Sequence, residues 1–364
     1  MTTYQIAFAS LRGMTRTLAG EILARIGSEE TFFTASERQL ATVLGFNNKL
    51  LSRSYRDDIL EKARIETEFV TRNNINVCYF TDERFPTRFT ECDDAPIILY
   101  TLGNCNLNAS RIVSIVGTRH ATPYGIDFTT RLVEELATTV EDLIIVSGLA
   151  YGIDIAAHRA ALNCAIPTIA VLAHGLNTIY PAQHRNTAAD IARQGGMLLT
   201  DYMSSDPVHK GNFVARNRIV AALCDCLVVS ESAEKGGALI TANIASGYNR
   251  DVFALPGRTS DRYSAGCNRL IASNIAGLVQ SASELSTAMR WPTKAVEGDQ
   301  TEMLSPLNDE EQAVIDYLST RDDATINQMC VALNYPIARL MALLIDMEFK
   351  GLILTFPGGR YRIA

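Results

Sequence analysis

The N-terminal part of the chain has the spacing of apolar residues that is typical of α-helices. Between residues 5 and 60 apolar side chains recur every three or four positions and so share one helical face. One such face carries Leu18, Ile22, Leu23 and Ile26. Gly27 is expected to end that helix, and Ser36 followed by Gln39 predicts a capping box at the start of the next one. These signals predict a small helical domain over residues 1–75.

A different pattern begins at Arg111, where short apolar runs alternate with helical stretches. The apolar runs read RIVSIVG, LIIVSG, TIAVLA, GMLLTDY, CLVVSE and DVFALPG. This alternation predicts parallel strands joined by crossover helices, and runs without polar alternation predict a sheet covered on both faces. The fold class is therefore α/β, with a doubly wound parallel sheet over residues 109–290.

The C-terminal part departs from this pattern after Trp291. Residues 291–306 are polar and without periodicity, which is typical of a linker. Residues 307–364 then predict three helices followed by two short strands around a PGG turn. That order fits a winged helix-turn-helix domain, although it also occurs in other small domains.

Composition narrows the class of protein. A chain of 364 residues with 47% hydrophobic residues is expected to form two or three domains with a sizeable core. No signal-peptide pattern and no membrane-length apolar run occurs, so we expect a cytoplasmic protein without a membrane partner. The eight cysteines lack the spacing of a zinc site, and neither a metal nor another cofactor is expected. A net charge of −7 argues against a surface coated with nucleic acid but is compatible with a local positive groove.

The turn after the first predicted strand of the sheet, SIVGTRHATPYG, has residue types that bind phosphate. Ligands of open parallel sheets bind at the carboxyl ends of the strands. Gly117 allows a sharp turn, Thr118 offers a hydroxyl and a free backbone N–H, and Arg119 offers a planar guanidinium. Pro123 and Gly125 are expected to begin a helix whose N-terminus favours anions. A structural turn with a solvated arginine explains these residues about as well.

Other predicted strands also end in glycine-containing turns. In VSGLAYGID, Gly148 permits close approach of the backbone, Asp154 is expected to cap its helix, and His158 is expected to pack inside. The loop AHGLNTIYPAQH is expected to pack and form hydrogen bonds through His174, Asn177, Tyr180 and His184. Two more glycine-containing turns follow predicted strands, EKGGALIT with Gly237 and ALPGRTSDRYSAG. Several such turns at one edge suit a polyanion better than a single nucleotide, and the GxGxxG motif of dinucleotide sites is absent.

The stretch HKGNFVARNRIVAAL combines cations with an aromatic residue at the start of a predicted helix. Its candidate residues are Lys210, Phe213, Arg216, Asn217 and Arg218. Cations follow the phosphates of a single strand, and an aromatic ring stacks on a base with a gain of about 1–3 kcal/mol. We therefore predict that this stretch binds single-stranded nucleic acid. The alternative is a core helix, with Phe213 buried and the arginines in surface ion pairs.

Six motifs stand in order along the chain. They are GTRHATPYG at 117–125, SGLAYGIDIAAHRAAL at 147–162, TIAVLAHGLNTIYPAQH at 168–184, FVARNRIVAAL at 213–223, GGALITANIA at 236–245 and VFALPG at 252–257. In these motifs the chain resembles the family of the DNA-processing protein DprA, also called Smf. The resemblance implies a Rossmann-like core at 76–290 with a lead-in segment at 76–108. It places a SAM-like or helix-hairpin-helix-like domain before this core and a winged helix after it.

The resemblance also implies a function and a set of site residues. The family is expected to be non-enzymatic and homodimeric: it binds and protects incoming single-stranded DNA during natural transformation and helps to load the recombinase RecA. Arg119 resembles the phosphate-gripping arginine, Lys210 a second cation, and Phe213 the aromatic residue that contacts a base. The predicted nucleic-acid interface is Gly117, Thr118, Arg119, Gly148, Lys210, Phe213, Arg216, Asn217, Arg218 and Gly237.

The sequence departs from the family pattern at a few positions. Threonines stand at 118 and 122 where serines are usual, and Val214 replaces a frequent proline. Ser230 and Gly236 replace a frequent valine and serine around Glu231, whose role the sequence leaves open.

Two other functions compete with this interpretation. The main alternative is a Rossmann-like hydrolase of nucleotides or ribosides, related to the phosphoribohydrolases. The catalytic glutamate of their PGGxGTxxE motif has no counterpart in EKGGALITANIA. A transcription factor that reads duplex DNA is less favoured, because the recognition helix PIARLMALLIDMEFKG carries as cations only Arg339 and Lys350.

Overall fold

The computed structural model describes residues 3–46, 48–292, 308–319, 321, 323–350, 352–356 and 359–363. The chain divides into two compact units, Met1–Ala295 and Val296–Ala364. From residue 293 onward, the predicted linker at 291–306 lies outside the described residues. In the described ranges no single helix is long and apolar enough to span a membrane. One bent pair, Ile326–Leu333 with Ile337–Glu348, reaches the required length and composition only when both helices are counted together.

Five α-helices form the N-terminal part of the first unit, in agreement with the apolar spacing. They are α1 (Thr3–Ala9), α2 (Arg16–Ile26), α3 (Glu29–Thr34), α4 (Glu37–Leu44) and α5 (Arg53–Arg72), with a 3₁₀ turn at Lys49–Leu51. Gly27 ends α2 with a φ of 91°, and Ser36 and Gln39 form the predicted capping box of α4. The fully buried Arg56 links these helices, because its guanidinium donates hydrogen bonds to three backbone oxygens.

A nine-stranded sheet forms the centre of the first unit. Its strands are β1 (Asn76–Tyr79), β2 (Ile98–Gly103), β3 (Arg111–Val116), β4 (Leu143–Ser147), β5 (Thr168–Val171), β6 (Met197–Thr200), β7 (Cys226–Val229), β8 (Asp251–Ala254) and β9 (Gly277–Leu278). The strand order is β1-β2-β6-β5-β4-β3-β7-β8-β9, and all pairs from β6 to β9 are parallel. The predicted α/β fold with a doubly wound sheet is therefore confirmed.

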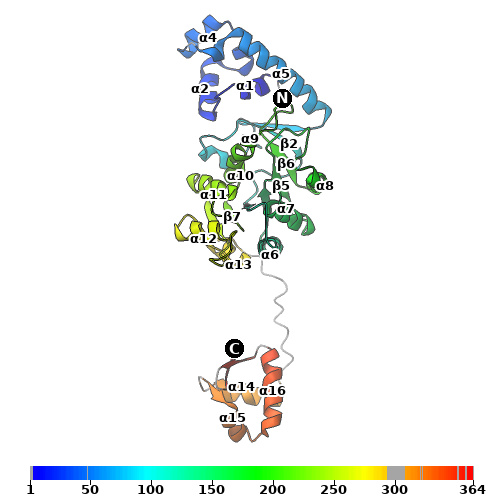
Figure 1. The fold of residues 1–364 in the computed structure, drawn as a ribbon, viewed down its shortest axis with the longest axis vertical. Helices are drawn as coiled ribbons and strands as arrows, with labels where there is room; N and C mark the ends of the chain where they lie inside the picture. Colours follow the sequence, from blue (N-terminus) through cyan, green and yellow to red (C-terminus); the bar gives the residue numbers. More distant parts are fainter. Residues whose placement is uncertain are drawn as a thin grey trace. The chain divides into compact units, whose positions relative to one another are not determined.

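Helices cover both faces of this sheet, which explains why its strands are apolar without polar alternation. They are α6 (Pro123–Thr139), α7 (Ile153–Asn163), α8 (Arg185–Arg193), α10 (Asn217–Leu223), α11 (Gly237–Gly247), α12 (Ala265–Ala272) and α13 (Ala282–Ala288). The short helix α9 (Lys210–Ala215), which has no buried residue, precedes α10. Helices α6, α7, α8 and α13 lie on one face, and α10, α11 and α12 lie on the other (Figure 1). Separate clusters of buried side chains fill the two sides, one around Leu132 and Ile153 and one around Leu223 and Leu239.

The lead-in segment at 76–108 adds two strands that the sequence did not predict. Strand β1 pairs antiparallel with β2, and β2 pairs antiparallel with β6. Antiparallel neighbours need no crossover helix, and only a 3₁₀ turn at Thr87–Glu91 connects β1 to β2. The outer part of this edge packs on the N-terminal helices, since Tyr79 and Tyr100 belong to the same buried cluster as Phe8 and Phe32.

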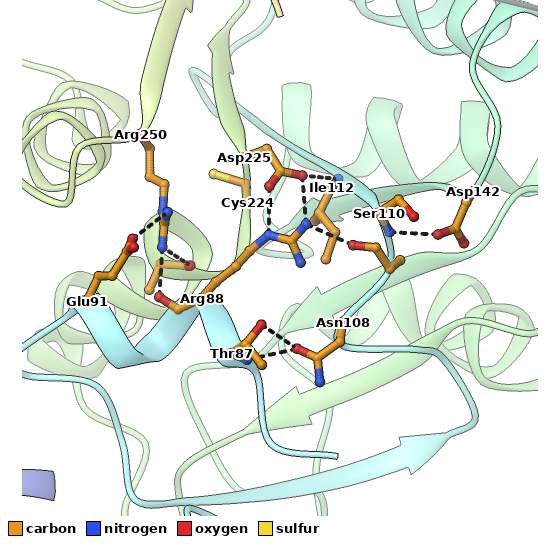
Figure 2. Close-up of polar contacts among 12 residues, drawn as sticks. Thr87, Arg88, Glu91, Asn108, Ser110, Ile112, Asp142, Cys224, Asp225 and Arg250 are labelled. Carbon is orange, nitrogen blue, oxygen red and sulfur yellow. Dashed lines mark hydrogen bonds and ion pairs between the residues drawn. The ribbon is translucent and has the colours of Figure 1, made fainter. Parts of the chain in front are cut away.

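Ionic contacts fasten the lead-in segment to the parallel part of the sheet (Figure 2). Arg88 donates to the carboxylate of Asp225 through Nε at 2.8 Å and Nη2 at 2.9 Å, and the backbone N–H of Ile112 donates to the same carboxylate at 2.7 Å. Arg250 donates to Glu91 at 3.1 Å and to the backbone oxygen of Arg88 at 2.7 Å. Asp225 directly precedes β7 and Ile112 lies at the start of β3. The network therefore lies at the amino edge of the sheet, opposite the edge where ligands are expected.

The second unit has the three helices and the two final strands that the sequence predicted, and it adds a short strand between the first two helices. Its elements are α14 (Asp309–Ser319), β10 (Ala324–Thr325), α15 (Ile326–Leu333), α16 (Ile337–Phe349), β11 (Ile353–Phe356) and β12 (Arg360–Ile363), with the sheet order β10-β12-β11. In the predicted recognition helix, Arg339 pairs with Glu310, and Lys350 pairs with Glu311 at 2.7 Å and with Asp346 at 2.6 Å. Because these cations are neutralised within the unit, α16 is poorly suited to grip duplex DNA.

Candidate nucleic-acid interface

The strand order reverses at β3, which lies between β4 and β7. In open α/β sheets a nucleotide binds in the crevice at this switch point. Here Glu231, which follows β7 and is 3% exposed, fills that position. Its carboxylate accepts hydrogen bonds from the backbone N–H of Thr122 at 2.8 Å and from the Thr122 hydroxyl at 2.6 Å. Because Thr122 is the N-cap of α6, a carboxylate of the protein occupies the helix end at which a phosphate binds in nucleotide-binding sheets.

The turn between β3 and α6 is held by backbone hydrogen bonds as well. The N–H of Thr118 donates to the backbone oxygen of Glu231 at 2.7 Å. The prediction of a free backbone N–H at Thr118 is therefore wrong, because the end of β7 occupies it. A Cβ at Gly117 would lie 2.4 Å from the side chain of Ile153, so this glycine allows α7 to pack against the turn. The turn is preformed by the protein and does not require a ligand to hold its shape.

Gly125 packs directly against Glu231, in the first turn of α6. A Cβ at Gly125 would lie 2.4 Å from the carboxyl carbon of Glu231. We expect Gly125→Ala to lower the free energy of unfolding by about 1–3 kcal/mol, because the buried carboxylate would have to move. The control is Gly20→Ala inside α2, where the added Cβ meets nothing within 4 Å. In that variant the free energy of unfolding should rise by about 0.5–1 kcal/mol, because alanine favours the helix interior over glycine. Urea titration measures the free energy of unfolding of both variants. If Gly125→Ala were as stabilising as Gly20→Ala, the close packing of Gly125 against Glu231 would be wrong.

Arg216, predicted to contact nucleic acid, lies inside the protein and is 4% exposed. Its guanidinium donates to the backbone oxygen of Gly148 at 2.8 Å and to that of Val171. The helix is interrupted at this residue, between α9 and α10, and the interruption directs the Arg216 side chain toward the ends of β4 and β5. A Cβ at Gly148 would lie 2.3 Å from Nη1 of Arg216, so the glycine admits this guanidinium. Burial therefore contradicts the predicted contact of Arg216 with DNA. The group that approaches the backbone of Gly148 closely is the guanidinium of Arg216.

Asp154 lies near Arg216 and holds the turn after β4. Its carboxylate accepts the backbone N–H groups of Gly148 at 3.1 Å and Ala150 at 3.4 Å. The prediction that Asp154 caps α7 is wrong, because the N-cap is Gly152 and the carboxylate binds the preceding turn. Burial raises the pKa of Asp154, and the positive charge of Arg216 opposes that rise.

Arg218 is also committed to a partner within the protein. It forms an ion pair with Asp201, and both side chains are largely buried. Burial raises the pKa of Asp201, and the charge of Arg218 opposes the rise. Because this ion pair occupies the guanidinium, the structure favours a structural role for Arg218 over the predicted contact with nucleic acid.

Arg119 and Phe213, far apart in the sequence, come together at the carboxyl edge of the sheet. The guanidinium carbon of Arg119 lies 5.6 Å from the ring centroid of Phe213 on α9. Tyr180, from the loop after β5, meets Phe213 edge to face at 5.5 Å between centroids and is 49% exposed. Lys210 is exposed one helical turn before Phe213. In the described part of the chain neither Arg119 nor Lys210 forms an ion pair.

We call these four residues, Arg119, Tyr180, Lys210 and Phe213, the carboxyl-edge surface. Its two free cations lie beside two partly exposed rings, the combination that grips a single strand of nucleic acid. The sequence assigned Tyr180 to loop packing, and only the fold shows that its ring meets Phe213. Of the other predicted residues, Asn217 is half-buried at the start of α10 and Gly237 is exposed at the start of α11.

The histidines near the strand ends pack and form hydrogen bonds, as predicted. His158 is fully buried with its Nδ1 2.7 Å from the Thr168 hydroxyl, and burial lowers the pKa of His158 to about 3. His174 accepts the backbone N–H of Tyr180 at 3.2 Å, which fixes the loop that carries this ring. The Nδ1 of His184 lies 2.8 Å from a backbone oxygen of the turn after β4.

The loop that leads into α9 is fixed by a residue of the N-terminal helices. Glu66 of α5 is 2% exposed, and its carboxylate accepts the backbone N–H of Ser204 at 2.9 Å. Asn177 donates to the backbone oxygen of Ser204 at 2.8 Å. Burial raises the pKa of Glu66, and the hydrogen bonds from Ser204 oppose the rise. The helical part thus helps to position Lys210 and Phe213 without contributing a side chain to the carboxyl-edge surface.

A hollow of about 1140 Å³ lies at the amino edge of the sheet, away from this surface. It is lined by residues of β1, β2 and the loops beside them, including Cys78, Asn104 and Cys105. Burial raises the pKa of Cys78 to about 11 and that of Cys105 to about 12. Both thiols therefore stay protonated near neutral pH, and the hollow offers no thiolate nucleophile.

Comparison with known proteins agrees with this architecture. The family model described as DNA recombination-mediator protein A matches residues 76–290 of the 364. The chain belongs to the DprA (Smf) family. A model described as the DprA winged helix domain matches residues 299–359. Both the predicted family and the predicted winged helix are thereby confirmed.

Individual relatives cover most of the chain. Protein Smf of Escherichia coli is 33% identical over 290 residues, which cover 77% of this chain and 75% of that protein. The X-ray structure of DprA from Streptococcus pneumoniae aligns with a TM-score of 0.63 at 29% identity, over 79% of this chain and 98% of that one. DprA of Helicobacter pylori, whose structure was described for its single-stranded DNA binding mode, aligns with a TM-score of 0.53 at 32% identity. That alignment covers 59% of this chain and 95% of the Helicobacter protein.

Proposed function

We propose that this chain binds single-stranded DNA across the carboxyl edge of its sheet and acts in this way as a recombination mediator. The observation that carries the proposal is the carboxyl-edge surface, where Arg119 lies over the ring of Phe213 and Tyr180 packs against that ring. The DprA family supplies the context, since its model is described as a recombination mediator and a relative has a described single-stranded DNA binding mode.

Binding rests on two physical interactions. Arg119 and Lys210 neutralise phosphates and release counterions, so affinity should fall as salt rises, with a slope of about −0.7 per phosphate for a single strand. Phe213 stacks on a base, which is sequence-tolerant because every base has a π-face. Tyr180 supports Phe213 from the side and limits the orientations of its ring. A duplex hides its base faces, so the surface should prefer single strands.

The buried carboxylates favour binding over hydrolysis. Asp154 is bound to the turn after β4, Asp201 to Arg218, and Glu231 to Thr122. A general acid or base must reach its substrate within hydrogen-bonding distance, and these three groups are engaged with the protein itself. These three carboxylates of the described residues therefore do not support the hydrolase alternative.

We further propose that the chain works as a homodimer and helps to load RecA, as the family resemblance implies. Sedimentation at micromolar concentration tests the first point, and a monomer at all concentrations would contradict it. The lag before RecA-catalysed ATP hydrolysis on coated single-stranded DNA tests the second. The chain should shorten that lag, and an unchanged lag would remove RecA loading from the proposal.

The direct test of the proposed function is fluorescence anisotropy with a labelled thymidine oligonucleotide of about twenty nucleotides and a matching duplex, across a salt series. We expect tighter binding to the single strand and a salt slope of about −1.4 or steeper, because two cations contact phosphates. Equal binding to the duplex, or no binding to either, would overturn the proposal.

A further inference from the structure

The turn after β3 directs two consecutive side chains to opposite sides. Arg119 points to Phe213, whereas His120 pairs with Tyr263 from the loop between β8 and α12. The rings of His120 and Tyr263 are stacked, with centroids 6.4 Å apart and an interplanar angle of 26°. The guanidinium carbon of Arg262 lies 5.8 Å from the Tyr263 ring centroid. A second aromatic pair with its own cation therefore adjoins the carboxyl-edge surface. We call His120, Tyr263 and Arg262 the second platform, and the carboxyl-edge surface the first platform.

The loop that carries Tyr263 is anchored to its neighbours. The backbone N–H of Ser232 donates to the backbone oxygen of Tyr263 at 2.7 Å. Tyr124 donates its hydroxyl hydrogen to the backbone oxygen of Pro256 at 2.8 Å, which fastens the same loop to α6. The ring pair is thus preformed at a defined position, as a binding platform requires.

The exposure and charge of this second platform suit a nucleic-acid strand. His120 and Arg262 are exposed and Tyr263 is half-buried. Arg258 and Arg262 stand in the same loop with Asp261, and neither arginine forms an ion pair with a residue that the structure describes. One excess positive charge and two neighbouring rings resemble the arrangement around Phe213, although His120 and Tyr263 are stacked whereas Tyr180 and Phe213 meet edge to face.

The two platforms are spaced for one continuous strand. Tyr180, which meets Phe213, lies in the loop after β5, and Tyr263 lies in the loop after β8. Strand β8 is four positions from β5 in the order β5-β4-β3-β7-β8. At about 4.8 Å per position the ends of β5 and β8 are about 19 Å apart, which sets the scale of the separation between the two ring pairs. At about 3.4 Å per stacked nucleotide, the same distance corresponds to about five or six nucleotides. The two platforms meet at consecutive residues, because Arg119 belongs to the first and His120 to the second, and the Cα atoms of neighbouring residues are about 3.8 Å apart.

We propose that single-stranded DNA held by Phe213 and Arg119 continues over the switch point onto the His120–Tyr263 ring pair, where Arg262 holds the backbone and a second base stacks. The inference rests on the proposed function and adds a second stacking position to the same edge. It assigns a binding role to the rings and cations of the β8–α12 loop, which the sequence analysis named only as one of several glycine-containing turns.

A length series of thymidine oligonucleotides, from about three to about twelve nucleotides, tests the proposal by anisotropy. Wild-type affinity should rise steeply once the oligonucleotide spans both platforms, at about six nucleotides. In Tyr263→Ala this rise should be missing, with affinity for the longest oligonucleotide reduced about tenfold and affinity for the shortest unchanged. Tyr263→Phe keeps the ring and should behave as the wild type.

Phe213→Ala should instead weaken binding at every length, so that the two platforms can be told apart. His120→Ala changes an exposed side chain and provides the same test without risk to the fold. If the wild type binds and Phe213→Ala weakens it, but neither Tyr263→Ala nor His120→Ala changes the length dependence, the second platform is refuted and the proposed function stands. If the wild type binds no oligonucleotide of any length, the proposed function itself fails.

Discussion

Arg216→Met is expected to lower the free energy of unfolding by about 3–5 kcal/mol, measured by urea titration. The substitution keeps most of the side-chain volume but removes the donors to the backbone oxygens of Gly148 and Val171. It also leaves Asp154 buried without its neighbouring positive charge. An unpaired buried charge is among the largest single destabilising effects in proteins, which is why this variant should lose more stability than Gly125→Ala.

Two further variants make this expectation specific. Arg159→Met changes an exposed arginine of α7 and should shift the unfolding free energy by less than about 0.5 kcal/mol. Asp154→Asn added to Arg216→Met removes the stranded charge and should restore part of the loss. If Arg216→Met were as stable as Arg159→Met and lost DNA affinity instead, the internal role of Arg216 would be wrong and the contact predicted from the sequence would be right.

Arg119→Ala combined with Lys210→Ala is expected to reduce affinity for single-stranded DNA about hundredfold. A hydrogen bond to a charged group contributes about 1.5–3 kcal/mol. Loss of two such contacts at the lower value removes about 3 kcal/mol, and each 1.4 kcal/mol corresponds to a factor of ten. The salt slope should become shallower by about 1.4, because two phosphates are no longer neutralised. Anisotropy across a salt series measures both quantities in one experiment.

A matched double substitution separates this site from general electrostatic attraction. Lys62→Ala with Arg193→Ala removes the same two kinds of cation from exposed positions on α5 and at the end of α8. That variant should bind as tightly as the wild type, with less than a twofold difference attributable to net charge. Equal losses in the two double variants would mean that Arg119 and Lys210 act only through the charge of the whole protein.

The features that the sequence predicted correctly are those encoded locally. The end of α2 at Gly27 and the capping box formed by Ser36 and Gln39 depend on neighbours in the chain. The apolar runs predicted the parallel strands because each run is buried on both faces. The antiparallel strand β2 was missed, because its pairing with β6 depends on a distant segment.

The features that the sequence did not predict depend on contacts between distant segments. The stretch HKGNFVARNR does not indicate that the helix is interrupted at Arg216 or that this side chain points inward. The inward direction follows from the positions of Gly148 and Val171, whose backbone oxygens accept its hydrogen bonds. Glu231 closes the switch point only because β7 adjoins β3. The pairing of His120 with Tyr263 likewise follows from the strand order.

UV crosslinking of the wild-type protein to a thymidine oligonucleotide, followed by tryptic mass spectrometry, locates the residues that contact the single strand. A ring that stacks on a base is held against the photoreactive face of thymine. Adducts should therefore appear on the peptide of residues 211–216, which contains Phe213, and on the peptide of residues 160–185, which contains Tyr180. Adducts confined to α16, or to the residues of the hollow around Asn104, would show that the single strand does not bind at the carboxyl-edge surface.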